Sequence, residues 1–288
     1  MLMSERCSEC LLGRIEYECR LVTNDENVIR RAVEDCRKML SEAKDQAGPA
    51  PEISSALHRH VCSILGNSDP YRKIKEINNK DALELEEKIE EKLVSLYDYC
   101  LAAAIGNTLD YGSLEHEVTG NLYEFFLEEF SKDFTVENIA DFEPLCRNIL
   151  YLCDNSGEIV FDRLLIKYLK ENGARVVVVV RKNPIINDAT MKDAIELGLD
   201  KIGDKVLTNT EDIAELGVNL SLIPKELEEE IGNADLIISK GMANYESLSE
   251  LKKTHRLPPV AYLMMVKCEP IAEDIGIPKG SRIACLVK

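Results

Sequence analysis

Residues 149–165, ILYLCDNSGEIVFDRLL, pass from an apolar run through a polar turn into a helical pattern. The run 149–153 predicts a buried strand, and the spacing of Ile159, Phe161 and Leu165 predicts an amphipathic helix. In an α/β sheet, such a turn lies at the carboxyl end of a strand, where ligands bind. We therefore expect an α/β fold with a functional site beginning at Asp154.

The second half of the chain repeats this alternation of strand and helix. Further apolar runs predict strands at 176–180, 205–207, 236–239, 260–265 and 283–287. Helical patterns lie between most of them, at 158–171, 188–198, 211–216, 224–232 and 244–253. The runs are continuous rather than alternating, which indicates burial on both faces and hence a mostly parallel sheet covered by helices. The predicted fold is a three-layer α/β/α sandwich.

The first 130 or so residues carry helical spacing and no β-branched run. They include a predicted helix over 82–105, and another that begins at Pro70 with Asp69 as its N-cap. We therefore expect an N-terminal helical domain over 1–115 and an α/β Rossmann-like catalytic domain over 116–288.

Charge and hydropathy exclude several classes of protein. The net charge of −17 argues against nucleic-acid binding, which needs clustered lysine and arginine. No apolar run reaches the length of a membrane span, and the N-terminus lacks the layout of a signal peptide. The expected location is the cytoplasm, with no membrane partner.

Polar side chains follow several of the predicted strands. They are Asp154, Asn155 and Glu158 after the first strand, Asp188 after the second, Lys240 and Asn244 after the fourth, and Lys267 after the fifth. The ends of parallel strands meet at one edge of a sheet, so these groups should converge. Carboxylate and amide oxygens suit Mg²⁺ or Mn²⁺, and lysines suit phosphate. This combination predicts metal-assisted phosphoryl transfer to water.

Each of these residues also has a purely structural interpretation. Asp154 and Asp188 could cap the helices that follow them. Lys240 could lie in a solvated turn, and Lys267 could extend its ammonium group to solvent. The convergence of several strand ends on one kind of chemistry favours a functional site.

Six motifs resemble a known family, the metal-dependent damage-control phosphatases, once catalogued as a domain of unknown function. They are DPY at 69–71, GNTLD at 106–110, DNSGE at 154–158, PIINDAT at 184–190, SKGMANYE at 239–246 and KCEP at 267–270. Together with Cys7, Cys10 and Cys268, they resemble the cysteine-containing, archaeal type of the family.

The resemblance implies a divalent cation (Mg²⁺, Mn²⁺ or a similar ion such as Ni²⁺ or Co²⁺) held by Asp154, Asn155 and Asp188. It implies that these residues act in catalysis together with Lys267, which binds phosphate. It further implies a substrate pocket, lined by Glu158, Lys240, Asn244, Asn107 and Asp110. The expected substrates are small phosphorylated metabolites, such as sugar phosphates or phosphorylated cofactor precursors.

Alternatives remain open at this stage. A carboxyl methyltransferase that uses S-adenosylmethionine is one, although no glycine-rich loop follows the first strand. A non-catalytic protein that binds phosphorylated metabolites is another. A covalent route through Asp154 is conceivable, but Ser156 stands where the haloacid-dehalogenase pattern has a second Asp, so we favour water as the nucleophile.

Ten cysteines are scattered along the chain without a disulfide pattern. Cys7 and Cys10 are one helical turn apart, and with Cys268 they form a candidate second metal site. A structural zinc site usually has four ligands, so His58 and His60 are candidates for the remaining position. A thioredoxin-like redox role is less favoured, because the N-terminus lacks the βαβ setting.

Overall fold

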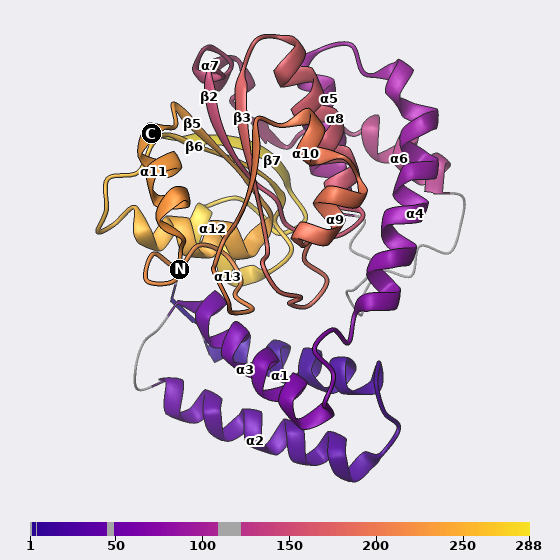
Figure 1. The fold of residues 1–288 in the computed structure, drawn as a ribbon, viewed down its shortest axis with the longest axis vertical. Coiled ribbons are helices and arrows are strands. Elements are labelled where there is room, and N and C mark those ends of the chain that lie inside the picture. Colours follow the sequence, from indigo (N-terminus) through magenta and orange to yellow (C-terminus); the bar gives the residue numbers. More distant parts are fainter. Residues whose placement is uncertain (1, 4, 45–48, 109–121) are drawn as a thin grey trace.

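The computed structural model describes residues 2–3, 5–44, 49–108 and 122–288, and these form a seven-stranded sheet with helices on both faces (Figure 1). The strands are β1 Val136–Glu137, β2 Asn148–Leu152, β3 Arg175–Val180, β4 Lys205–Thr208, β5 Leu236–Lys240, β6 Val260–Met265 and β7 Arg282–Val287. Their order is β1-β7-β6-β5-β2-β3-β4, and every neighbouring pair is parallel except β6 and β7. The predicted, mostly parallel α/β sheet is confirmed.

The described helices lie before, between and after these strands. They are α1 Glu5–Arg20, α2 Glu26–Lys44, α3 Ala50–Leu65, α4 Arg72–Ile89, α5 Leu96–Gly106, α6 Leu122–Phe130, α7 Ile139–Phe142, α8 Glu158–Glu171, α9 Met191–Glu196, α10 Leu199–Ile202, α11 Lys225–Asn233, α12 Gly241–Leu251 and α13 Glu269–Ile275. Two short 3₁₀ helices, Glu90–Lys92 and Glu143–Leu145, complete the set. None of the described helices has both the length and the apolar character that a membrane crossing requires.

Successive residues of the central strands point to opposite faces of the sheet. Ile149 and Tyr151 belong to the core on the face covered by α5 and α8, whereas Leu150 and Leu152 belong to the core on the face covered by α11 and α12. Because both faces are buried, the strands need to be apolar throughout. This arrangement confirms the predicted three layers.

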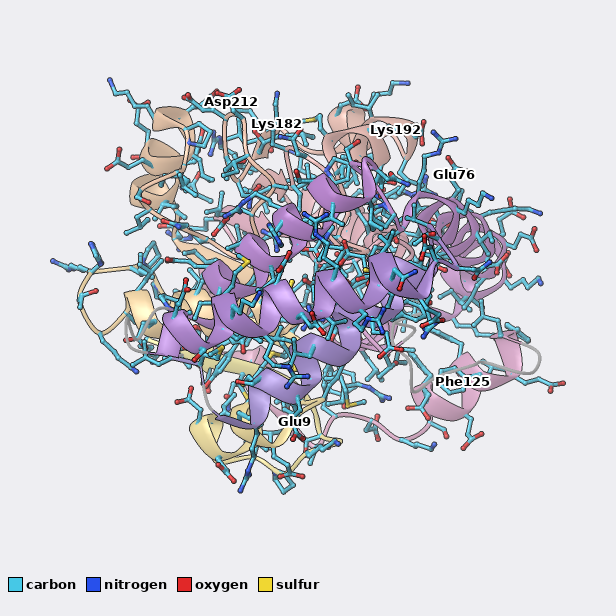
Figure 2. The ribbon with its side chains drawn as sticks, turned by 90° about the horizontal axis from the view of Figure 1, so that it is seen from below. Glu9, Glu76, Phe125, Lys182, Lys192 and Asp212 are labelled. Atoms are coloured by element: carbon cyan, nitrogen blue, oxygen red, sulfur yellow. The ribbon has the colours of Figure 1, made fainter. Side chains whose placement is uncertain are left out.

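The N-terminal helices lie at one end of the sheet. In Figure 1, α1, α2 and α3 lie at the lower end of the molecule, and Figure 2 shows them from below, in front of the α/β part. These three helices share a core of their own, whereas α4 and α5 pack on α8. The predicted domain boundary at residue 115 falls outside the described residues and stays a prediction.

Three helix predictions differ from the structure, and the first is 211–216, which forms no helix. The pattern over 82–105 is not one helix: α4 ends at Ile89, and α5 begins after Ser95, which forms a capping box with Asp98. The N-cap of α4 is Tyr71 and not Asp69. The Asp69 carboxylate pairs instead with Lys75, at 2.7 Å between Oδ2 and Nζ.

The order of the strands creates a switch point between β2 and β5. From β2 the chain proceeds outward to β3 and β4, whereas β5 returns to the other side of β2 and leads on to β6. The connections after β2 and β5 therefore diverge, and in open α/β sheets ligands bind at the carboxyl ends of strands at such a point. Leu152 pairs with Ser239 in this register, so Asp154 lies close to the start of α12 at Gly241.

Candidate active site

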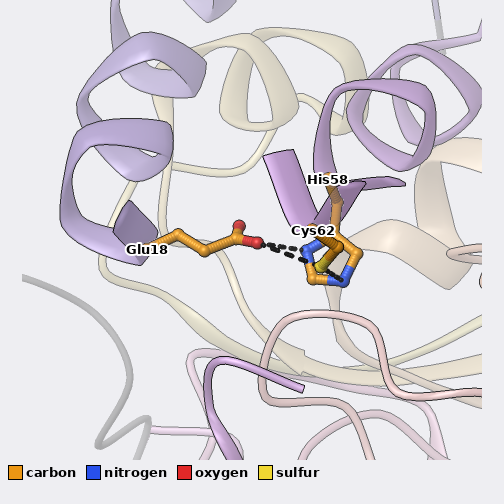
Figure 3. A group of neighbouring side chains, drawn as sticks. All are labelled: Glu18, His58 and Cys62. Carbon is orange, nitrogen blue, oxygen red and sulfur yellow. Dashed lines mark hydrogen bonds and ion pairs between the residues drawn. The ribbon is translucent and has the colours of Figure 1, made fainter. Parts of the chain in front are cut away.

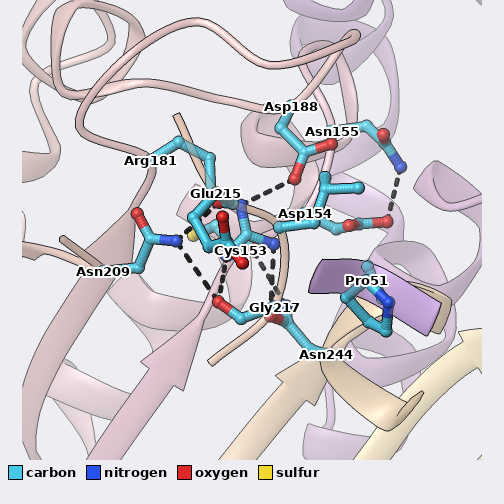
Figure 4. A network of polar contacts seen from close by, with 12 residues as sticks. Pro51, Cys153, Asp154, Asn155, Arg181, Asp188, Asn209, Glu215, Gly217 and Asn244 are labelled. Carbon is cyan, nitrogen blue, oxygen red and sulfur yellow. Dashed lines mark hydrogen bonds and ion pairs between the residues drawn. The ribbon is translucent and has the colours of Figure 1, made fainter. Parts of the chain in front are cut away.

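The turn after β2 meets the loop after β3, as Figure 4 shows for Asp154, Asn155 and Asp188. Asn155 and Asp188 form an isolated antiparallel bridge. Ala189 N also donates to the main-chain oxygen of Asp154 at 2.8 Å. The structure thus brings together the three side chains that the resemblance assigns to a cation.

Both carboxylates of this group are buried, with exposures of 7% for Asp154 and 3% for Asp188. Burial raises the pKa of Asp154 well above its usual value, and the charges of Asp188 and Glu158 raise it further. Arg181 and Lys267 act in the opposite direction. Each of these buried carboxyl groups disfavours the ionisation of the other. A divalent cation between them would stabilise the ionised form of both.

The amide of Asn155 is oriented by its acidic neighbours. Its Nδ2 donates to Asp154 Oδ2 at 2.6 Å and to Glu158 Oε2 at 3.0 Å. The amide nitrogen is therefore turned toward the acids, which leaves the oxygen as the atom that can face a cation. Asp154, Asn155 and Asp188 form an oxygen donor set of the kind that Mg²⁺ or Mn²⁺ accepts.

The interpretation of Asp154 and Asp188 as helix caps is wrong. Helix α8 has Gly157 at its N-cap and no side-chain cap, while the Gly157 N–H donates to Asn79 Oδ1 at 2.7 Å. The next helix in this region, α9, begins after Thr190, which forms a capping box with Asp193. The two carboxylates are thus not used at either helix end.

Arg181, at the end of β3, holds Asp188 in place. Its guanidinium donates from Nε to Asp188 Oδ2 at 2.7 Å, and its two other nitrogens donate to Gly217 O at 2.8 Å and to Asn244 Oδ1 at 3.2 Å. With 3% exposure, it is a buried cation beside the site. Arg181 was not among the predicted site residues, and its place directly after the valine strand was the available signal.

Asn244 fastens α12 to the end of β2. Its Nδ2 donates to Cys153 O at 3.1 Å and to Lys240 O at 2.8 Å, while its oxygen accepts from Arg181. These bonds make Asn244 a bridge between the two strand ends at the switch point. A direct contact of Asn244 with substrate stays a prediction.

Lys240 lies behind Glu158 in a buried ionic cluster. Its Nζ donates to Glu158 Oε1 and to Asp162 Oδ1, both at 2.6 Å, and to Ala103 O at 3.0 Å. Burial lowers the pKa of Lys240, but Asp162 and Glu158 raise it by more, so the ammonium form is held. All three ammonium protons thus have protein acceptors. The contact of Lys240 with substrate that the resemblance implies stays a prediction.

Asn107 reaches the site from the C-terminal end of α5. Its Nδ2 donates to Glu158 Oε2 at 2.9 Å and to Asp154 Oδ2 at 3.3 Å, and its oxygen accepts from Met265 N at 3.0 Å. The side chain therefore ties the helical part to the ends of β2 and β6. Asp110, the other residue expected from this segment, lies outside the described residues.

Gly241 and Lys267 complete the surroundings of Asp154. Gly241 has a φ of +71°, and a Cβ atom at this position would lie 1.8 Å from Asp154 Oδ2. Lys267 follows β6, is half-buried, and is near enough to lower the pKa of Asp154. A lysine at the mouth of a buried carboxylate cluster suits an anionic ligand.

The three cysteines singled out in the sequence lie near one another. Burial raises the pKa of Cys268 to about 11, and the proximity of Cys7 and Cys10 contributes to the rise. The two histidines considered with them have other neighbours: His60 Nε2 lies 3.6 Å from Asp35 Oδ2, and His58 lies beside Glu18. A metal at the three cysteines stays a prediction.

Comparisons with known proteins point to one family. Residues 3–283 match the family described as the damage-control phosphatase ARMT1-like domain. A damage-control phosphatase of Archaeoglobus fulgidus is 37% identical over 296 residues, covering 100% of both chains. A damage-control phosphatase of Pyrococcus horikoshii is 30% identical over 293 residues, covering 98% of this chain and 97% of its own. The crystal structure of a DUF89 family protein from Pyrococcus horikoshii has a TM-score of 0.90 at 29% identity, covering 100% of both chains.

Proposed function

The chain belongs to the damage-control phosphatase ARMT1-like family, and we propose on that premise that it hydrolyses phosphate monoesters of small metabolites with a divalent cation. The observation that carries the proposal is the convergence of Asp154, Asn155 and Asp188 at the switch point, with Lys267 beside them. Sugar phosphates and phosphorylated cofactor precursors are the proposed substrate class, which rests on the family resemblance.

Asp154, Asn155 and Asp188 would hold the cation, which is Mg²⁺, Mn²⁺ or a similar ion such as Ni²⁺ or Co²⁺. When bound, it would supply Lewis-acid polarisation of the phosphoryl group. The buried, mutually repelling carboxylates fit such an ion, because its charge offsets the cost of ionising both.

The remaining residues position the substrate and the carboxylates. Lys267 would neutralise phosphate oxygens as negative charge shifts during the reaction. Arg181 holds Asp188, and Asn107 holds Asp154 through hydrogen bonds. Water is the proposed nucleophile: its oxygen forms the new bond to phosphorus, the ester bond breaks, and the metabolite leaves as an alcohol.

The test is phosphate release from a panel of sugar phosphates and phosphorylated cofactor precursors. It is run with the metal-stripped protein and after addition of Mg²⁺, Mn²⁺, Ni²⁺ or Co²⁺. We expect release that needs metal and is lost in the Asp154→Asn/Asp188→Asn double variant. Asp200→Asn, at an exposed position in α10, is the matched control and should keep full activity.

Three results would contradict the proposal. Release that survives in the double variant would remove the assignment of the carboxylates. Tight binding of a phosphorylated metabolite without turnover in any metal would support the non-catalytic alternative. Methyl transfer from S-adenosylmethionine to a carboxyl group would support the methyltransferase alternative.

A further inference from the structure

A second cluster of metal-ligating side chains lies inside the N-terminal helices, away from the candidate active site. Glu18 on α1 meets His58 and Cys62 on α3, as Figure 3 shows. One ligand atom from each residue can be chosen so that all three lie within 4.8 Å of one another. His58 and Cys62 are four residues apart in one helix, so both side chains lie on the same face, opposite Glu18.

The two distances from Cys62 match those between ligands of one ion. Cys62 Sγ lies 3.4 Å from His58 Nε2 and 3.7 Å from Glu18 Oε1. Ligands at zinc bond lengths of about 2.0–2.3 Å are about 3.5 Å apart in a tetrahedron. Cys62 thus already has this spacing to both partners, while Glu18 and His58, paired at 2.8 Å, would move apart slightly around an ion.

Hydrogen bonds within the described part of the chain leave the cluster incompletely satisfied. The side chains of Glu18 and His58 are only 1% and 3% exposed. Glu18 Oε2 and His58 Nδ1 are buried and have no hydrogen-bond partner among the described residues. His58 Nδ1 nevertheless lies 2.8 Å from Glu18 Oε1, the distance of an ion pair. The ion pair uses only one oxygen of the Glu18 carboxylate, so Oε2 stays buried without a hydrogen-bond partner among the described residues.

We propose that Glu18, His58 and Cys62 bind one Zn²⁺ ion that fastens α1 to α3. A carboxylate, a thiolate and a neutral imidazole around a dication have a net charge of zero, which suits the apolar core of these helices. Binding releases the thiol proton to solvent, and water takes the fourth position. Because Glu18 and His58 are buried and Cys62 is half-buried, we assign a structural rather than a catalytic role to this site.

The site shares no residue with either metal site considered above, and it lies at the other end of α1 from Cys7. Glu18 lies 11 residues after Cys7 in α1, which at about 1.5 Å per residue is about 16 Å along the helix. Helix α3 nevertheless bears on the active site, because Ser55 Oγ accepts from Leu216 N at 2.9 Å. Leu216 adjoins Gly217, whose carbonyl accepts from Arg181.

The test uses full-length protein with Cys7→Ser, Cys10→Ser and Cys268→Ser, which removes the other candidate thiol ligands. Titration of this metal-stripped background with Co²⁺ should give thiolate-to-cobalt charge-transfer absorption that saturates at one equivalent. The oxygen ligands Asp154, Asn155 and Asp188 give no such band. Zn²⁺ should displace the cobalt and raise the Tm of the background by about 5 °C.

Two variants in this background identify the ligands. Cys62→Ser should abolish the charge-transfer band, whereas Cys36→Ser, at another buried cysteine of the same helices, should keep it. Glu18→Gln retains the size of the side chain and should weaken Co²⁺ binding at least tenfold with an unchanged far-UV circular dichroism spectrum. If Cys62→Ser does not fold, Glu18→Gln still tests the proposal.

Any of three results would overturn the proposal. Absence of the band in the triple-serine background would mean that the cluster is a metal-free buried group. Persistence of the band in Cys62→Ser, or unchanged Co²⁺ affinity in Glu18→Gln, would place the metal elsewhere.

Discussion

A Cβ atom at position 241 would lie 1.8 Å from Oδ2 of Asp154 and 2.2 Å from its Cγ, so Gly241 leaves the space that the Asp154 carboxylate occupies. The glycine is the first residue of α12 and has a φ of +71°, which other residues rarely adopt. The start of α12 can therefore approach the end of β2 this closely only because position 241 has no side chain.

We expect Gly241→Ala to lower kcat/KM at least about 100-fold, because displacement of a site carboxylate by 1 Å is enough for such a loss. Gly276→Ala is the matched control, since Gly276 has a φ of +72° and open space around it. In both variants an alanine must adopt a positive φ, which lowers the free energy of unfolding by about 1 kcal/mol. Equal phosphatase activity in the two variants would contradict the role of Gly241.

Arg181→Lys should reduce kcat/KM about 10- to 100-fold while keeping the positive charge. Lysine cannot reproduce three directed bonds to Asp188, Gly217 and Asn244 from one planar group, so Asp188 would be less well held. Steady-state kinetics at saturating metal measure the effect. Lys182→Ala, at the exposed neighbouring position, should leave kcat/KM unchanged, and a similar loss there would show that the effect is not specific.

Lys267→Ala should cost several kcal/mol of transition-state stabilisation, the scale seen when one charge-stabilising donor is removed. The measured quantity is kcat/KM for the best substrate of the panel. A loss of less than about threefold, which corresponds to under 1 kcal/mol, would exclude the proposed role. Lys279→Ala, at an exposed position near the C-terminus, controls for the general loss of a positive charge.

Asp162 should make the stability of the protein depend on pH. Burial raises its pKa from 3.8 to about 6 in the folded protein. Between these values the folded state holds a proton that the unfolded state has released, so stability is favoured below pH 4 and decreases as the pH rises through 6. The full change is roughly 3 kcal/mol, at 1.36 kcal/mol per pKa unit.

Urea unfolding of wild type and Asp162→Asn at pH 4 to 7 measures this contribution. The substitution itself changes the free energy of unfolding by an amount that does not depend on pH. Relative to wild type, Asp162→Asn should nevertheless become more stable as the pH rises, because only the wild type loses the contribution of the Asp162 proton. Asp141→Asn, at an exposed position, should run parallel to the wild type. A constant difference between Asp162→Asn and wild type would refute the prediction.

The sheet could be predicted from sequence because its strands are buried on both faces. Continuous apolar runs such as 176–180 are local signals, and β3 extends only one residue beyond that run. The break between α4 and α5 was missed because Leu93 and Leu96 continue the apolar spacing of the helices. Its signal was the pair Ser95 and Asp98, which forms the capping box.

The surroundings of the site were harder to predict, because its partners come from distant segments. Arg181 has acceptors 36 and 63 residues further along the chain, and no local pattern connects them. A lysine after a strand predicts a cleft residue, but Lys240 is buried against Glu158 and Asp162. These two acids are four residues apart on α8, a spacing that could have indicated a shared buried partner.

The hydrogen bonds of Asn79 and Asn107 have a consequence for folding kinetics. Asn79 joins Gly157 and Asp193, and Asn107 joins Glu158 and Met265, so each asparagine closes chain loops of tens to more than a hundred residues. Contacts that close long loops form late, after local helices and neighbouring strands. The turn at Asp154 would thus acquire its geometry only when the whole chain has folded. A partly folded intermediate with a complete sheet would remain inactive.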